Sequence, residues 1–367
     1  MKLGSDLEKV NWGTSVATPA IPRQNNAVSG DERSSTEASR GRQRVAALDF
    51  SKGLLVVIMV LYHWMNYFLS VDGSVYKYLR FLTPSFIFIT GFLISHVYGV
   101  RYRNAPSRVT RRLLIRGFKL LFLVAILDVL QSTITDPHRA HRIAAGSFLQ
   151  TSVSCLVGTQ SPAFSVLYPI AYLLVCAALL FYLSRFFRHA LYVATFLVVV
   201  VSAVAEWERW PTGYLQIFSL GLVGMIVGRI SLDRLQRDVV GRGYLLLMGY
   251  TAYLAVVTIW DVSYPVQLVG VSLTLGLIYA LAVWSVRLAK FQEVMVLLGQ
   301  YSLYGYIAQI IILQVLRRTT SHYSSSVAWT DGALIVALFL TILSVQLIAE
   351  ARTRLASVDR VYRIVFC

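Results

Sequence analysis

Charged residues are scarce in this chain. Asp, Glu, Lys and Arg make up 14% of its 367 residues, whereas 56% are hydrophobic and the mean hydropathy is +0.62. A soluble domain usually carries charge on about a quarter of its residues. The composition therefore excludes a soluble globular protein and indicates an integral membrane protein.

Cysteine is almost as scarce. The three cysteines, Cys155, Cys176 and Cys367, contain no pair with the spacing of metal ligands. We therefore expect neither a disulfide nor a metal site.

The apolar residues fall in long runs, most of them of the length that crosses a bilayer core of about 30 Å. A helix is the expected form of each run, because lipid offers no hydrogen-bond partner to a free backbone group. The predicted fold is all-α, a polytopic bundle of about ten transmembrane helices. Its spans are Leu54–Val71, Leu79–Gly99, Leu113–Gln131, Phe164–Leu183, Ala190–Ala205, Tyr214–Ile230, Tyr244–Trp260, Tyr264–Val286, Val294–Leu316 and Ala333–Ala351.

Lys and Arg predict the orientation of these spans. With both ends cytoplasmic, the inner segments include the Arg-rich Val100–Arg112, Ser231–Gly243 and the C-terminus, whereas the outer loops carry few basic residues. The net charge of +16 is then explained by topology and by contact with anionic lipid, so we expect no nucleic-acid partner. The predicted location is the plasma (inner) membrane, crossed many times.

The first 43 residues differ from the rest. They are polar, show no sustained apolar period and lack the apolar core of a secretory signal. We predict a disordered cytoplasmic tail over residues 1–43, a transmembrane domain over residues 44–363 and a short C-terminal end over residues 364–367.

His63 is the strongest candidate for chemistry, because polar groups within membrane spans are expensive and usually functional. It follows Lys52 by eleven residues, which on a helix is about 16 Å of rise and only about 20° of rotation. Lys52 then lies at the cytoplasmic mouth and His63 near mid-membrane on the same face, with Asn66 one turn further. A structural role remains open, with His63 bonding a neighbouring helix and Lys52 reaching lipid phosphate. Asp49 either pairs with Lys52 or caps the first span, and we favour the cap.

Several segments carry a family resemblance. Ala47–Gly53 and Pro84–Ser95 resemble the first two spans of the acyltransferase family 3 membrane enzymes. This superfamily includes the periplasmic-glucan succinyltransferases and the membrane acetyltransferases that act on heparan glucosamine. Further similar stretches, within a resemblance that covers roughly Arg44 to Arg363, are Arg111–Arg116, Leu167–Pro169, Tyr214–Gly221 and Leu298–Tyr304.

The chain departs from the family pattern at two places. The family signature is an Arg, ten residues and a His, and here His63 matches but Lys52 replaces the Arg. Lys lacks the planar fork with which Arg grips a phosphate or carboxylate. The ninth span has Tyr306 and Gln309 in a stretch where many sugar O-acetylating relatives carry a His, which favours the succinyltransferase-like branches or a specialised substrate.

The resemblance implies a membrane acyltransferase that moves an acetyl or succinyl group from cytoplasmic acyl-CoA to a hydroxyl of a glycan or lipid-linked sugar at the outer face. His63 is the expected general base. The CoA phosphates are expected on a basic rim formed by Lys52, Arg111, Arg112 and Arg116. Hydrogen bonds to the oxyanion or the acceptor are expected from Asn66, Ser85 and Thr90, and further acceptor contacts from Asp128, Gln131, Tyr168 and Gln216.

Two alternatives remain. A transporter or flippase of a glycan or lipid precursor also uses polar groups at mid-membrane, but it is expected to show paired carboxylates or broken helices there. Asp128 is the one acidic residue well inside a predicted span. A catalytically inactive scaffold is the other alternative, based on Lys52 in place of Arg.

The charge alternation predicts the sides of the loops. Reporters fused after Val71, Ala205 and Trp260 should be non-cytoplasmic, and reporters fused after Gly99 and Ile230 cytoplasmic, as measured by the activity of side-specific reporter enzymes. Opposite results at any two of these five positions contradict the topology.

Overall fold

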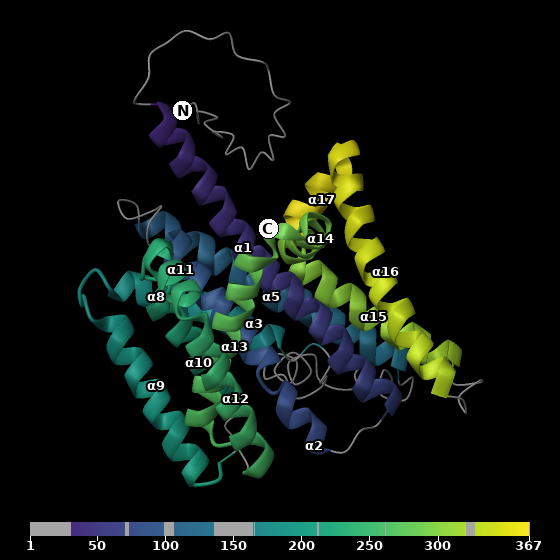
Figure 1. The fold of residues 1–367 in the computed structure, drawn as a ribbon, viewed down its shortest axis with the longest axis horizontal. Coiled ribbons are helices and arrows are strands. Elements are labelled where there is room, and N and C mark those ends of the chain that lie inside the picture. The colour runs from purple at the N-terminus through teal and green to yellow at the C-terminus, as the bar shows by residue number, and fades with distance from the viewer. Residues whose placement is uncertain are drawn as a thin grey trace, which may run out of the picture. The chain divides into compact units, whose positions relative to one another are not determined.

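The structure, a computed structural model, describes residues 31–69, 73–98, 106–135, 164, 166–210, 213–260, 262–320 and 327–366. In these ranges all regular structure is helical and no strand occurs (Figure 1). The elements are α1 (Asp31–Trp64), η1 (Met65–Leu69), α2 (Gly73–Tyr76), η2 (Lys77–Leu79), α3 (Leu82–Leu93), η3 (Ile94–Tyr98), α5 (Pro106–Thr135), α8 (Leu167–Leu183), α9 (Ala190–Trp207), α10 (Gly213–Val227), α11 (Leu232–Gly241), α12 (Gly243–Ile259), α13 (Tyr264–Trp284), η4 (Ser285–Arg287), α14 (Ala289–Gln300), α15 (Ser302–Thr320), α16 (Val327–Arg354) and α17 (Ala356–Phe366).

By its internal contacts the chain divides into two units, residues 1–42 and 43–367. Residues 1–30 of the predicted tail over residues 1–43 lie outside the described residues. Helix α1 begins at Asp31, but the side chains up to residue 45 are not described. Its disorder stays a prediction. Cys155 and Cys367 also lie outside the described residues, while Cys176 is a free thiol on α8.

Every predicted span falls on helical structure, and the all-helical membrane fold is confirmed. Among the described residues, five helices are long and apolar enough to cross a bilayer, and seven if each of two bent pairs is one span. The count of ten and the cytoplasmic position of both ends stay predictions. The five are Ala46–Leu69, Lys77–Tyr98, Ala190–Trp207, Tyr264–Trp284 and Thr330–Arg354.

The prediction of one continuous helix over Val294–Leu316 is wrong. Helix α14 ends at Gln300, α15 begins at Ser302, and the two are bent by 90° (Figure 1). The apolar run continues through this α14–α15 elbow, so hydropathy alone does not reveal the bend. Helices α10 and α11 are likewise bent, by 104°, just after the predicted sixth span.

Two glycines bring the backbones of α1 and α14 into contact. A Cβ on Gly53 would collide with the carbonyl of Met295, and a Cβ on Gly299 would collide with the carbonyl of Asp49. Small residues at such crossings let membrane helices approach closely enough for dispersion to hold them together. The crossing fixes the start of the first span against the α14–α15 elbow.

A second glycine-lined crossing joins α3 to α10. Gly91 meets the backbone of Gly221, while Gly224 and Gly228 meet the backbone of α3 at Phe88 and beyond. These contacts are possible only because the glycines carry no Cβ. Helix α3 is thereby held at a fixed register along α10.

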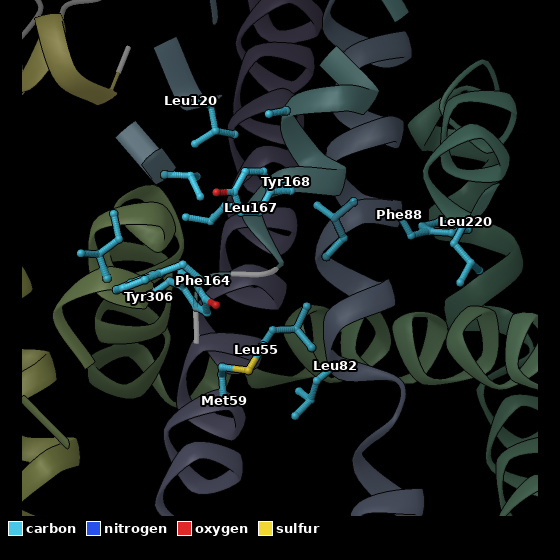
Figure 2. Close-up of a cluster of buried hydrophobic side chains, with 14 of the residues drawn as sticks. Leu55, Met59, Leu82, Phe88, Leu120, Phe164, Leu167, Tyr168, Leu220 and Tyr306 are labelled. Atoms are coloured by element: carbon cyan, nitrogen blue, oxygen red, sulfur yellow. The ribbon is translucent and has the colours of Figure 1, made fainter. Parts of the chain in front are cut away.

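A buried apolar cluster fills the space between these helices. Figure 2 shows side chains from α1, α3, α5, α8, α10 and α15 converging on it. Tyr306 of α15 packs edge-on against Phe164, with ring centroids 6.5 Å apart. This cluster adjoins the last turns of α1, where His63 lies. Its labelled members are Leu55, Met59, Leu82, Phe88, Leu120, Phe164, Leu167, Tyr168, Leu220 and Tyr306.

The C-terminal helix α17 clamps the elbow. Arg352 donates to Asp359 Oδ1 at 2.9 and 2.7 Å and to the hydroxyl of Tyr301 at 3.1 Å, and its guanidinium lies 4.1 Å from the ring centre of Tyr362. We call Arg352, Asp359 and Tyr362 the C-terminal clamp.

Hydrogen bonding from Arg352 lowers the pKa of Asp359, helped by Arg363. The stabilisation by this pair is therefore present above an ordinary carboxyl pKa and is lost as the pH falls through the lowered one.

The α1–α14 crossing generates a stability prediction. Gly299→Ala should destabilise the protein by about 1–3 kcal/mol, because the new methyl group must push apart two backbones. Thermal unfolding in detergent or nanodiscs measures it. The control is Gly332→Ala on α16, where an added Cβ meets nothing within 4 Å, so its Tm should be unchanged or slightly raised. Equal Tm values for the two variants would contradict the crossing.

Candidate active site

His63 lies in the last turn of α1 and is 5% exposed. Neither ring nitrogen has a hydrogen-bond partner among the described residues. Buried polar groups in native proteins are nearly always paired, so an unpaired one needs an explanation. The described residues do not occupy the hydrogen-bonding capacity of this imidazole.

Three tyrosine rings surround the imidazole. Tyr62 meets it edge-on at 5.3 Å between ring centroids, Tyr67 stacks on it at 5.8 Å, and Tyr306 lies 6.2 Å away. The π-helical turn η1 follows directly after Trp64 and brings Tyr67 over the imidazole. The rings exclude bulk water from His63, which strengthens any electrostatic interaction there.

Asp128 and Tyr168, both predicted to contact the substrate that accepts the acyl group, meet in the buried interior. The Tyr168 hydroxyl donates to Asp128 Oδ2 at 2.5 Å, and both side chains are buried. Tyr168 and Tyr306 belong to the same cluster, from α8 and α15 respectively (Figure 2). Helix α5 thus places the Asp128 carboxylate on the Tyr168 side of this cluster.

A cavity of about 590 Å³ opens near the end of α1 away from Lys52. Tyr62, which contacts His63, forms part of its wall, together with Tyr76, Arg80, Tyr214 and Gln267. Its size suits a small organic ligand. The Tyr62 side chain therefore both lines the cavity and contacts the His63 imidazole.

Lys52 is held by an ion pair. Its Nζ lies 2.6 Å from Asp49 Oδ1, one helical turn earlier, and both side chains are largely buried. The predicted cap is wrong, because α1 begins at Asp31 and Asp49 is inside the helix. Asp49 takes the pairing role instead, and its backbone faces Gly299 of the elbow.

The predicted arginines lie near the start of α5. Arg116 donates to the Tyr98 hydroxyl at 2.5 Å, Arg112 is half-buried and Arg111 is exposed. Lys52 lies on a different helix, α1, where it pairs with Asp49. The four predicted rim residues therefore come from two helices, α1 and α5.

The remaining predicted residues divide by environment. Ser85 is fully buried, and its hydroxyl has no partner in the described part of the chain. Thr90 donates to the carbonyl of Phe86 at 2.7 Å, a bond within its own helix. Gln216 is half-buried on α10, whose Gly213, Tyr214 and Ile217 line the cavity. The side chain of Gln131 is outside the described ones.

Asn66 is exposed, unlike His63 one turn before it. The reason is η1, whose wider turn changes the register after Trp64, so that the expected polar stripe does not continue to Asn66. Its Oδ1 lies 3.5 Å from the Tyr76 hydroxyl, at the cavity wall.

Comparison with protein families shows the family of this chain. A family model described as an acyltransferase domain matches residues 45–349, the greater part of the chain. The chain belongs to acyltransferase family 3. It is therefore an acyltransferase, and its apolar helices make it an integral membrane member of that family. No curated protein and no solved structure matches it.

Sequence reasoning about this acyltransferase missed the tyrosines around His63 and gave no role to Gln309. Gln309 is fully buried on α15, and neither its amide nitrogen nor its oxygen has a partner among the described residues. Tyr67 follows His63 by four residues, a spacing that predicts contact on a helix. For Tyr306 and Gln309 the family pattern marked the stretch, in which many relatives carry a His, but no spacing in the sequence predicts their approach to α1, because it is a tertiary contact.

The position of Lys52 predicts a role in donor binding. Lys52→Ala should raise the KM for acyl-CoA, because it removes a cation placed to meet a phosphate or carboxylate, whereas Lys52→Arg should preserve or raise activity. Steady-state kinetics in membranes at matched protein levels measures both. An unchanged KM in Lys52→Ala would remove Lys52 from donor binding.

Proposed function

We propose that this acyltransferase moves an acetyl or succinyl group from cytoplasmic acyl-CoA to a hydroxyl of a glycan or lipid-linked sugar at the outer face of the plasma (inner) membrane. The observation that carries the proposal is His63, a buried imidazole whose two nitrogens have no partner among the described residues and whose neighbour Tyr62 lines a cavity. An imidazole in this state is available to a substrate.

The donor side of the proposal rests on charge. Lys52 stands three turns before His63 on α1, and Arg111, Arg112 and Arg116 line the start of α5. CoA carries several phosphate charges, and guanidinium and ammonium groups are the side chains that bind phosphate. We assign the CoA phosphates to these residues and the thioester to the stretch of α1 between Lys52 and His63.

The chemical role of His63 follows from its surroundings. A neutral imidazole accepts the proton of the acceptor hydroxyl while that oxygen attacks the thioester carbonyl carbon. As the C–S bond breaks, the imidazolium returns the proton to the CoA sulfur. The tyrosine rings around His63 keep bulk water away, which limits hydrolysis of the thioester.

The acceptor side of the proposal rests on the cavity. Its wall combines tyrosine rings with the polar groups of Arg80 and Gln267. A sugar ring offers both apolar faces and hydroxyls, and such a mixed wall suits it. Asp128, which bonds Tyr168 and interacts electrostatically with Tyr214 of the wall, supports this side, while Asn66, Ser85 and Gln216 remain proposed contacts.

The bend between α14 and α15 gives little support to the transporter alternative. The α14–α15 elbow lies beside Asp49 near the start of the first span and beside Arg352 near the end of α16. Transporter sites with interrupted helices lie near the bilayer midplane. The elbow is therefore at the level of the helix ends and not at the level of His63.

His63→Gln should abolish acyl transfer and leave expression and insertion intact. Gln keeps a hydrogen bond but cannot take up the proton. Transfer of labelled acyl groups from acyl-CoA to the membrane acceptor fraction, at matched protein level, measures this.

The matched control is His96→Gln. His96 is a half-buried histidine on η3 that stacks on Phe92 at 5.5 Å, away from the rings around His63, and its variant should keep transfer. Wild-type transfer by His63→Gln would exclude the general-base role and favour the transporter.

A further inference from the structure

Gln309 is the most completely buried amide in the described part of the chain, with an exposed fraction of 0%. Its Nε2 and Oε1 both lack a hydrogen-bond partner there. An amide without partners in an apolar interior loses its hydration and gains nothing in exchange. Folding alone therefore gives no reason for an amide at this place.

Contacts on either side fix the level of Gln309 along α1. One turn before it on α15, Tyr306 lies 6.2 Å from the ring of His63. Further along, Gln314 bonds Tyr67, which stacks on His63. Gln309 lies between these two levels, so it is at the height of the imidazole.

The helical period also gives the direction of Gln309. Gly305 and Leu313 lie one turn to either side of it on nearly the same stripe of α15. An added Cβ on Gly305 would lie 3.5 Å from Val56 of α1 and 3.6 Å from Val345 of α16. Leu313 belongs to a cluster with residues of both helices, Val60 and Trp64 of α1 and Ala333 and Ala337 of α16. Since both neighbours on the stripe face α1 and α16, Gln309 faces the seam between α16 and the stretch of α1 that ends at His63.

Within the described part of the chain, two buried side chains on neighbouring helices thus have four nitrogen and oxygen atoms without partners. Several buried threonine hydroxyls in the helices are satisfied by their own backbone, as Thr341 is by the carbonyl of Ala337 at 2.7 Å. Neither His63 nor Gln309 is satisfied in this way. A polar ligand that reaches both explains the two together.

We propose that Gln309 is a second catalytic residue, whose amide N–H donates to the carbonyl oxygen of the acyl thioester. This inference rests on the proposed function and adds the group that holds the oxyanion. An amide donor in a site without bulk water stabilises negative charge there strongly, because its dipole is already in place.

The step balances with both residues in these roles. The acceptor oxygen forms a bond to the thioester carbon and gives its proton to His63, while the carbonyl oxygen becomes the oxyanion and accepts from Gln309. The oxyanion then collapses, the C–S bond breaks, and the CoA sulfur takes the proton from His63. Gln309 gains and loses no proton.

The test compares Gln309→Met with wild type. Met has a similar length and no N–H, so kcat for acyl transfer should fall by about 100-fold to 1,000-fold, as for loss of an oxyanion donor. The KM for acyl-CoA should change little, because the bond is strongest in the transition state. The Tm should be equal to or above that of wild type, since an unpartnered amide is replaced by an apolar chain.

Two further variants complete the design. Gln309→Glu keeps the shape but loses the N–H donors when it is ionised, and it should lose transfer as well. Gln346→Met, at an exposed glutamine on α16, is the matched control and should leave both kcat and Tm unchanged.

The outcomes separate this inference from the proposed function. If wild type transfers and His63→Gln does not, but Gln309→Met keeps kcat within twofold, the role of Gln309 is overturned and that of His63 stands. A fall in Tm with unchanged kcat in the folded fraction assigns Gln309 to helix packing and also overturns it. If wild type transfers no acyl group, the proposed function fails and takes this inference with it.

Discussion

The contact on which the site depends is the crossing of α1 and α14 at two glycines. Gly53 and Gly299 let backbone meet backbone, and the chain turns by 90° directly afterwards. Because the elbow is held against Asp49, α15 starts beside the first span and runs along it. Tyr306 and Gln309 reach the level of His63 only through this arrangement.

A comparison of polar groups inside the helices shows which ones the fold satisfies. Thr90, Thr195 and Thr274 each donate to a carbonyl four residues earlier, which lets a hydroxyl sit in an apolar helix at little expense. His63 and Gln309 have no such bond in the described structure. The lack of a partner, and not polarity itself, distinguishes His63 and Gln309 from these threonines.

Much of this was accessible from the sequence. The apolar runs predict the helices, and the position of His63 in the first run, with the surrounding motif, predicts the family and the candidate base. The elbow, the environment of Asn66 and the pairing of Asp49 were not predictable in this way. Each depends on backbone geometry that hydropathy does not encode: a close crossing at Gly299, a π turn after Trp64, and a helix that begins well before the candidate span Ala46–Leu69. The tyrosine from α15 was missed for the same reason, since nothing local to Tyr306 indicates its partner on α1.

The C-terminal clamp has a consequence for the boundaries of the domain. The family match ends at residue 349, whereas Arg352, Asp359 and Tyr362 all follow it. Arg352 nevertheless bonds Tyr301 at the centre of the elbow, so the last turn of α16 and helix α17 support the part of α15 that faces His63. A chain cut at the family boundary would keep every residue assigned to catalysis and still lack this brace. The working unit of this enzyme therefore extends beyond the segment by which its family is recognised.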